Sequence, residues 1–143
     1  MHESPYFHNG LPVVHPSVCL FGDLLGFTRL VRGCRSEAEH NALLQRFWKL
    51  IRETREDWEA VRSFGGTSWN YQIFSDSFVV AFPLRSISAR FEPELGQCIE
   101  IIADHQLNLA LNGFVLRGGI TVGPLHVSEQ LCFGQALIES HQL

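Results

Sequence analysis

Two aspartates, Asp23 and Asp76, lie at the ends of apolar segments that are typical of β-strands. Asp23 closes the run SVCLFGD at 17–23, and Asp76 lies in the polar SDS near the middle of WNYQIFSDSFVVAF at 69–82. Two carboxylates brought together would repel each other, but a bound divalent cation favours the ionised form of both. Oxygen ligands are typical of Mg²⁺ or Mn²⁺ rather than zinc. The pattern predicts a metal site formed by the two aspartates, with the alternative that each aspartate only caps a turn.

The turn that follows Asp23 predicts an anion site beside the metal. Gly26 allows a ligand to approach the backbone closely, and consecutive N–H groups lead into a helical turn near Thr28. Arg29 lies just beyond the turn and could contact the same anion, although a solvated surface position explains it equally well. Together these features predict that a metal ion and a phosphate group are bound side by side.

The elements that must position these residues follow from hydrophobic periodicity and helix caps. Ser36 and Glu39 form a capping box, which predicts that a helix starts there, and Pro93 suits the first turn of a second helix. The expected elements are a strand at 17–23, a helix from 36 to about 61, a hairpin of two strands within 69–82, a helix from 93 to 112, a strand at 114–124, and one more strand with the start of a helix within 126–143.

This order predicts an α+β fold, the ferredoxin-like split βαββαβ arrangement, with an antiparallel sheet and two helices on one face. The first strand is central in such a sheet and the hairpin pairs beside it, so Asp23 and Asp76 are expected to converge at one edge. The opposite face of the sheet is expected to carry Trp69, Tyr71 or their neighbours, and a second protomer is its simplest cover.

Length and composition limit the possible functions. The 143 residues predict a single domain, with residues 1–12 as an irregular lead-in and a C-terminal part that is incomplete. The net charge of −4 disfavours nucleic acid, and the absence of an apolar run of about 20 residues disfavours direct membrane contact. Four widely spaced cysteines and no signal-peptide pattern predict reduced thiols and a cytoplasmic location.

Four segments together resemble the class III nucleotidyl cyclases, the family of adenylate and guanylate cyclases. The first two, FGDLLGFTRL and IFSDSFVVAF, are similar to the family's two metal motifs. The third, VLRGGITVGPLHV, resembles its RxGIxxGP strand, and FGQALIESHQL resembles the start of its YGxxxN helix. The similarity extends over 17–143, and the motifs occur in the family's order.

The resemblance implies a class III cyclase catalytic domain that cyclises a nucleoside triphosphate and releases pyrophosphate. Its sites would lie between two subunits of a head-to-tail homodimer, each with two Mg²⁺ or Mn²⁺ ions bound by Asp23, Asp76 and the carbonyl of Leu24. The amides of Leu25, Gly26, Phe27 and Thr28 would hold the triphosphate. Arg117 could reach phosphate from the partner subunit as a further catalytic residue, or form an ordinary surface ion pair.

Some family positions differ here. The two base-reading positions fall at Gln72 and Leu131, and neither supports selection of ATP or GTP. The transition-state asparagine and arginine would fall at Ile138 and Gln142, which cannot supply their chemistry.

The ending FGQALIES is similar to the bacterial pyrimidine cyclases of antiphage defence, the Pycsar systems, which make cyclic UMP or cyclic CMP. This similarity implies a uridylate or cytidylate cyclase, with UTP favoured, whose product acts on a separately encoded TIR or transmembrane effector. Within this interpretation Tyr71 and Gln72 are candidates for the base pocket, although a strand tyrosine is often half-buried packing. The alternatives are a catalytically degenerate nucleotide-binding or dimerisation module, and a purine cyclase.

Overall fold

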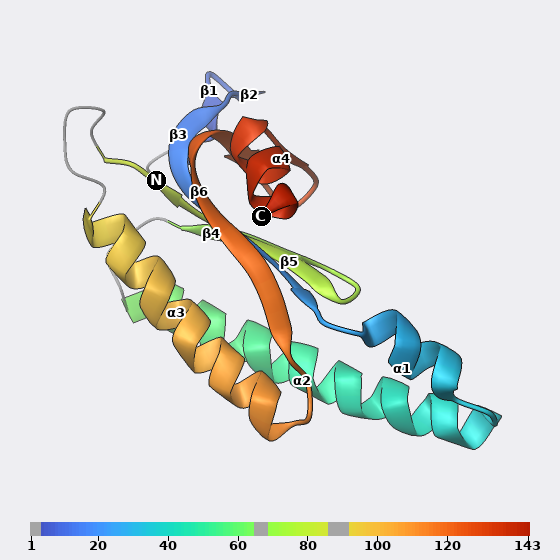
Figure 1. The fold of residues 1–143 in the computed structure, drawn as a ribbon. Coiled ribbons are helices and arrows are strands. Elements are labelled where there is room, and N and C mark those ends of the chain that lie inside the picture. Colours follow the sequence, from blue (N-terminus) through green and yellow to red (C-terminus); the bar gives the residue numbers. More distant parts are fainter. Residues whose placement is uncertain (1–3, 65–68, 86–91) are drawn as a thin grey trace.

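The computed structural model describes residues 4–64, 69–85 and 92–143. Figure 1 shows a twisted sheet with the long helices α2 and α3 at one side and α4 at the other. The elements in chain order are β1 (Phe7–His8), β2 (Leu11–Pro12), β3 (His15–Leu24), α1 (Phe27–Gly33), α2 (Glu37–Phe64), β4 (Asn70–Phe74), β5 (Ser77–Pro83), α3 (Glu92–Leu111), β6 (Leu116–Val127), β7 (Cys132–Phe133) and α4 (Gln135–Gln142).

The main sheet has the strand order β4-β5-β3-β6-β7, and each neighbouring pair is antiparallel. The central strand is β3, with the hairpin strand β5 on one side and β6 on the other. Connecting β3 to the hairpin through α2, and the hairpin to β6 through α3, gives the split βαββαβ arrangement. The ferredoxin-like α+β fold expected from the sequence is therefore confirmed.

Local hydrogen bonds mark the start of α2, and a glycine marks the end of α3. The hydroxyl of Ser36 accepts a hydrogen bond from the amide of Glu39 (3.2 Å), and the Glu39 carboxylate accepts one from the amide of Arg35 (2.6 Å). These bonds satisfy N–H groups that a helix start leaves without partners. The helix α3 ends before Gly113, whose φ of 80° lies in the left-handed region that favours glycine.

The face of the sheet that contacts α2 and α3 holds the larger aromatic core. Trp58 of α2 packs edge-on against Trp69 (6.2 Å between ring centroids) and Tyr71 (5.1 Å), and Trp69 stacks on Phe82 (5.6 Å). Trp69 is only 2% exposed. The expectation that Trp69 and Tyr71 lie on the face opposite the helices is therefore wrong, because α2 covers them within the same chain. A second protomer as the cover of that opposite face stays a prediction.

The opposite face of the sheet has its own buried cluster. Cys19 and Val79 of the sheet pack there with Tyr6 from the N-terminal segment and Ala136 from α4. The Tyr6 hydroxyl is hydrogen-bonded to Ser17 Oγ at 2.8 Å. Part of this face is thus covered by the chain itself.

The lead-in is not irregular as expected from the sequence, because β1 and β2 form a small antiparallel hairpin. Asn9 and Gly10 both have positive φ, 51° and 76°, which is the geometry of a type I′ turn. The Asn-Gly pair is the sequence signal for this hairpin. Residues 1–3 of the lead-in lie outside the described residues.

All four cysteines are free thiols, as the sequence predicts. Burial raises the pKa of Cys19 to about 11 and that of Cys98 to about 12, so both side chains are neutral packing groups at physiological pH. In the described part of the chain, no helix has both the length and the apolar composition to cross a membrane.

Candidate functional site

The end of β3 places Asp23 on the sheet face that points away from α2 and α3. Side chains alternate along a strand, so Asp23 shares its face with Cys19, whereas Leu24 is buried in the helix-side core. In the register of the sheet, Asp23 lies opposite Ser77 of β5 and Arg117 of β6.

Arg117 and Asp23 form a bidentate ion pair. The Nε of Arg117 donates to Oδ1 (2.8 Å) and Oδ2 (3.2 Å) of Asp23, and Nη2 donates to Oδ2 (3.0 Å). The hydrogen bonds and the negative charge of Asp23 raise the pKa of Arg117 above its usual value. The Asp23 side chain is 19% exposed and that of Arg117 67%. Of the two roles considered for Arg117, contact with phosphate or an ordinary surface ion pair, the structure shows an ion pair.

The close approach of β3 and β6 is made possible by glycine at Gly118, which lies opposite Gly22. A Cβ at Gly118 would collide with the carbonyl oxygen of Phe21. The sequence GG after Arg117 therefore has a packing reason, and it sets the strand spacing at which Arg117 reaches Asp23.

Asp76 lies in the turn between β4 and β5, next to the end of β3. The backbone N–H of Leu24 donates to the carbonyl oxygen of Asp76 at 3.0 Å, which ties the two chain segments together. Both aspartates line one cavity of about 610 Å³. This volume is within the range of small-molecule sites, about 300–1,000 Å³.

The turn after Asp23 forms another wall of this cavity through Gly26, Phe27 and Thr28. Gly26 has a φ of 74° and begins α1, so the first amides of that helix have no intrahelical acceptor. Leu25 differs from the other three predicted phosphate ligands. Its N–H donates to the carbonyl of Val115 (2.7 Å), and it lines a neighbouring groove instead. The Leu25 amide is therefore already used within the fold.

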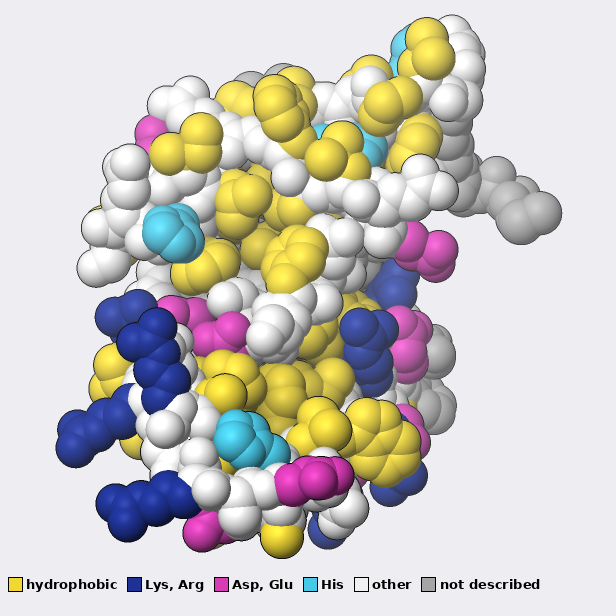
Figure 2. Space-filling view, turned by 90° about the vertical axis from the view of Figure 1, so that its right-hand side faces the viewer, with side chains coloured by type: hydrophobic (Ala, Val, Ile, Leu, Met, Phe, Trp, Pro, Cys, Tyr) yellow, Lys and Arg dark blue, Asp and Glu magenta, His cyan; other side chains and the backbone are white. Residues whose placement is uncertain are grey.

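Two further arginines of α1, Arg29 and Arg32, complete the cavity with Arg117. Figure 2 shows basic side chains gathered on one side of the face that carries α1, with acidic side chains next to them. Arg32 was not among the residues predicted from the sequence. The sequence could have indicated it, because Arg32 follows Arg29 by three residues and residues three apart share one face of a helix.

The donor atoms in the cavity are of the kind that Mg²⁺ and Mn²⁺ prefer. Among the described residues, no group of three or more His, Cys, Asp or Glu side chains could hold a metal ion. Mg²⁺ needs fewer protein ligands, since it commonly uses one or two carboxylates together with water and substrate phosphates. Asp23, Asp76 and the Leu24 carbonyl fit this requirement, and Arg117 competes with a metal ion for the Asp23 carboxylate.

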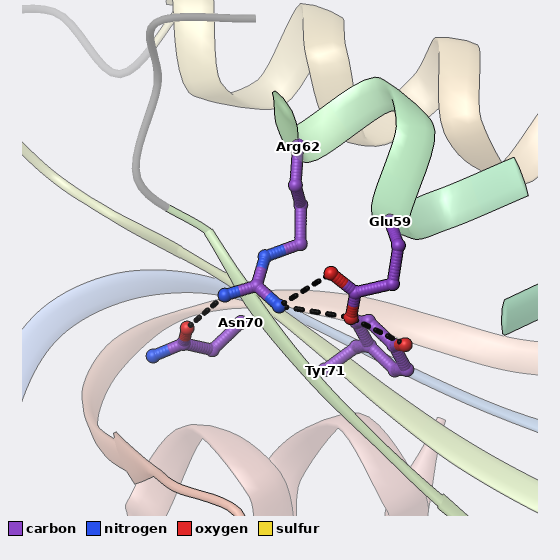
Figure 3. Close-up of polar contacts among 4 residues, drawn as sticks. All are labelled: Glu59, Arg62, Asn70 and Tyr71. Carbon is purple, nitrogen blue, oxygen red and sulfur yellow. Dashed lines mark hydrogen bonds and ion pairs between the residues drawn. The ribbon is translucent and has the colours of Figure 1, made fainter. Parts of the chain in front are cut away.

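Neither Tyr71 nor Gln72, its neighbour in β4, lines this cavity. Figure 3 shows the Tyr71 hydroxyl at the Glu59 carboxylate, to which it donates a hydrogen bond of 2.8 Å. Arg62 bonds the same carboxylate (3.1 Å and 3.3 Å) and also donates to Asn70 (3.3 Å). Burial and the bond to Glu59 raise the pKa of Tyr71 to about 12. Within one chain, Tyr71 thus has the packing and hydrogen bond that its structural alternative expects, and a role in a base pocket stays a prediction.

Gln72 points to the sheet face that carries Asp23, because it alternates with Tyr71 along β4. Its Nε2 donates to the carbonyl of Glu129 (3.2 Å) in the loop between β6 and β7. Leu131, the other base-reading position, lies in that loop and is bonded to Ser128. Within the described segments, the buried Oε1 of Gln72 has no hydrogen-bond partner. Gln72 is thus bonded to the loop that carries Leu131, the other position that the resemblance assigns to base reading.

Ile138 and Gln142, the positions that the sequence resemblance assigns to the transition-state asparagine and arginine, lie on α4. Ile138 is 61% exposed, and Gln142 is also exposed. Neither residue lines the cavity that holds the two aspartates.

No protein-family model matches this chain, and no curated protein matches it. A solved structure does: the crystal structure of the adenylyl cyclase CyaB from P. aeruginosa has a TM-score of 0.63 and 15% sequence identity. The match covers 89% of this chain and 69% of the CyaB chain. At this identity the similarity concerns the fold, and the chain therefore has the α+β fold of the CyaB adenylyl cyclase.

Proposed function

We propose that this chain is a metal-dependent nucleotidyl cyclase. It converts a pyrimidine nucleoside triphosphate, UTP in preference to CTP, to the 3′,5′-cyclic monophosphate and pyrophosphate. The observation that carries the proposal is that Asp23, Asp76 and the turn 26–28 line one cavity in a fold similar to that of an adenylyl cyclase.

In the reaction, the 3′-oxygen of the ribose attacks the α-phosphorus, and the bond from that phosphorus to the β-phosphate oxygen breaks. Pyrophosphate leaves, and the 3′-hydroxyl proton passes to solvent. Asp23, Asp76 and the Leu24 carbonyl bind the metal ions, which when present lower the pKa of the 3′-hydroxyl and neutralise phosphate charge. The amides of Phe27 and Thr28 orient the triphosphate. Arg117, once it releases Asp23, supplies a positive charge to the phosphates.

The choice of a pyrimidine rests on the similarity of the ending FGQALIES to the pyrimidine cyclases. Gln72 and Leu131 lack the charged side chain that the resemblance associates with purine selection. The Oε1 of Gln72 is buried and has no hydrogen-bond partner among the described residues. It could meet a base only after the side chain moves, and it would then accept from the N3–H of uracil or the amino group of cytosine. Both pyrimidines carry such a donor, so the substrate assay compares them directly.

The active form in this proposal is a head-to-tail homodimer in which one subunit supplies the aspartates and the other the base pocket. Within the described residues of a single chain, Gln72 and Leu131 do not line the cavity of Asp23 and Asp76, which is consistent with composite sites. The cyclic product would act on a separately encoded TIR or transmembrane effector in antiphage defence.

The test is to incubate the purified protein with Mn²⁺ or Mg²⁺ and each of UTP, CTP, ATP and GTP, and to identify products by mass spectrometry. We expect cyclic UMP as the main product. Asp76→Asn should reduce its rate at least ~100-fold, because the metal loses a charged ligand. Asp104→Asn, a matched change on the exposed surface of α3, should leave the rate unchanged. A cyclic purine as the main product would reject the pyrimidine assignment.

The composite site has its own test. Equal amounts of Asp76→Asn and Gln72→Ala variants, each inactive alone, should recover about a quarter of the wild-type rate when mixed. Random exchange makes half of the dimers mixed, and each mixed dimer has one intact site of two. No recovery, although the subunits exchange, would place each complete site within one chain.

A second candidate function is nucleotide binding without turnover. It is favoured by Ile138 and Gln142, which offer no transition-state charge, and by Arg117, which occupies both oxygens of Asp23. Calorimetric binding of a triphosphate with no cyclic product from any of the four nucleotides would decide for this candidate.

A further inference from the structure

The helix α1 presents two arginines to the cavity, Arg29 and Arg32. Arg29 and Arg32 are exposed, one turn apart, and both line the cavity. Among the described residues neither forms an ion pair. Four other basic side chains form ion pairs: Lys49 with Glu53, Arg52 with Glu56, Arg62 with Glu59, and Arg117 with Asp23. The remaining arginines of the described residues do not line this cavity.

The charges that line the cavity differ from those of the whole chain. Three arginines face two aspartates there, a net charge of +1, whereas the chain as a whole carries −4. Because Asp23 already neutralises Arg117, the positive charge that remains available belongs to Arg29 and Arg32. An anion that approaches the otherwise acidic protein is therefore attracted to this side of the cavity.

The order of residues along α1 indicates which part of a substrate the pair would meet. Asp23 and the turn at Gly26 lie at one end, where the proposed reaction takes place at the α-phosphate. Arg32 follows Thr28 by four residues, which corresponds to about 6 Å along a helix. This distance is similar to that from the α-phosphate to the terminal phosphates. Guanidinium groups bind phosphate oxygens through paired hydrogen bonds.

We infer that Arg29 and Arg32 form a metal-independent anchor for the β- and γ-phosphates of the nucleotide, and for the pyrophosphate that the reaction releases. This inference rests on the proposed function, because it takes the substrate to be a nucleoside triphosphate. The anchor uses side-chain charge alone, so it acts before any metal is bound. It positions the phosphate chain so that the α-phosphate lies beside Asp23 and Asp76.

The test measures binding of inorganic tripolyphosphate and pyrophosphate by calorimetry, in the presence of EDTA and at low salt. We expect the wild-type protein to bind both anions and the Arg29→Gln/Arg32→Gln variant to bind them at least tenfold more weakly. The wild-type affinity should fall as salt is added, because exposed charges are screened. Arg35→Gln is the matched control: it removes one positive charge just beyond α1 but does not line the cavity.

Three results would overturn the inference: no binding by the wild-type protein without metal, unchanged affinity in the double variant, or an equal loss in Arg35→Gln. Circular dichroism of each variant shows that a loss of binding is not a loss of folding. The outcome is independent of catalysis. If the protein binds tripolyphosphate through Arg29 and Arg32 but makes no cyclic nucleotide, the phosphate anchor is supported and the proposed cyclase activity is rejected.

Discussion

The buried histidine behind the candidate site makes the stability of the fold dependent on pH. His105 of α3 is 6% exposed and packs edge-on against the rings of Trp58 and Phe78, with 5.1 Å between ring centroids in both contacts. Its closest polar contact is Thr54 Oγ1, 3.5 Å from Nδ1. Burial lowers the pKa of His105 from 6.5 to about 4. Phe78 follows the Asp76 turn by two residues, so this packing supports one wall of the site.

The sign and size of the effect follow from proton linkage. Between pH 6.5 and about 4 the unfolded chain binds a proton at this histidine and the folded chain does not, so the free energy of unfolding falls as the pH falls. With one pKa unit worth about 1.4 kcal/mol, the loss from pH 7.5 to pH 5 amounts to about 2 kcal/mol. Below pH 4 both states are protonated at His105, and this residue causes no further loss.

The measurement is urea unfolding, followed by tryptophan fluorescence, at pH 7.5 and pH 5.0. We expect His105→Leu to lose less stability than the wild-type protein over this interval, by about 2 kcal/mol. The exposed His8 provides the control variant His8→Gln, which should keep the wild-type dependence. Equal pH dependence in His105→Leu and wild type would refute the reasoning. An NMR titration of the wild-type imidazole gives a second measurement, and protonation above pH 6 would contradict it as well.

Three other predictions concern the site and the strands that build it. Arg117→Met should raise the affinity for Mn²⁺ without nucleotide about two- to fivefold, as measured by electron paramagnetic resonance, because an exposed ion pair then no longer competes for the aspartate; unchanged affinity would exclude this competition. Gly118→Ala should lower the free energy of unfolding, measured by thermal melts, by about 2 kcal/mol or more, because the added methyl group collides with a neighbouring backbone carbonyl. The control Gly96→Ala in α3, where the added methyl group has open space, should be neutral or stabilising in the same measurement. Tyr71→Phe should lower the free energy of unfolding by about 1 kcal/mol, because the hydrogen bond from the hydroxyl to Glu59 is lost, and should leave the dissociation constant for the nucleotide unchanged. A weaker affinity for the nucleotide would show that Tyr71 contributes to the base pocket.

Much of the fold could be predicted from the sequence because its signals are local. The capping box at Ser36, the helical spacing of Leu50 and Trp58, and the Gly113 stop each act within a few residues, and the structure has them where expected. The order of the elements then leaves few topologies, and the split βαββαβ sheet is one of them. The Asn9-Gly10 hairpin was equally local and could have been predicted from its turn residues.

Tyr71 shows what a correct strand prediction leaves open. Moving by one residue along a strand changes the sheet face, so an uncertain register exchanges the roles of Tyr71 and Gln72. The sequence places both in one strand, but only the packing of Tyr71 against Trp58 shows which of them faces the helices. The pairing of Arg117 with Asp23 has the same origin, because it depends on the register between β3 and β6, which are joined by more than 90 residues.

The ion pair between Arg117 and Asp23 also bears on the order in which ligands bind. A carboxylate whose two oxygens accept hydrogen bonds from a guanidinium binds a metal ion more weakly, because the guanidinium occupies one lone pair of each oxygen and adds a competing positive charge. A phosphate group held nearby by Arg29 and Arg32 is an alternative partner for Arg117, since all three side chains line the same cavity. Nucleotide binding would then free Asp23 and tighten metal binding, and by reciprocity metal would tighten nucleotide binding by the same factor. The Arg117→Met variant should lose this mutual effect even where its affinity for metal alone increases, which separates coupling through Arg117 from simple charge attraction.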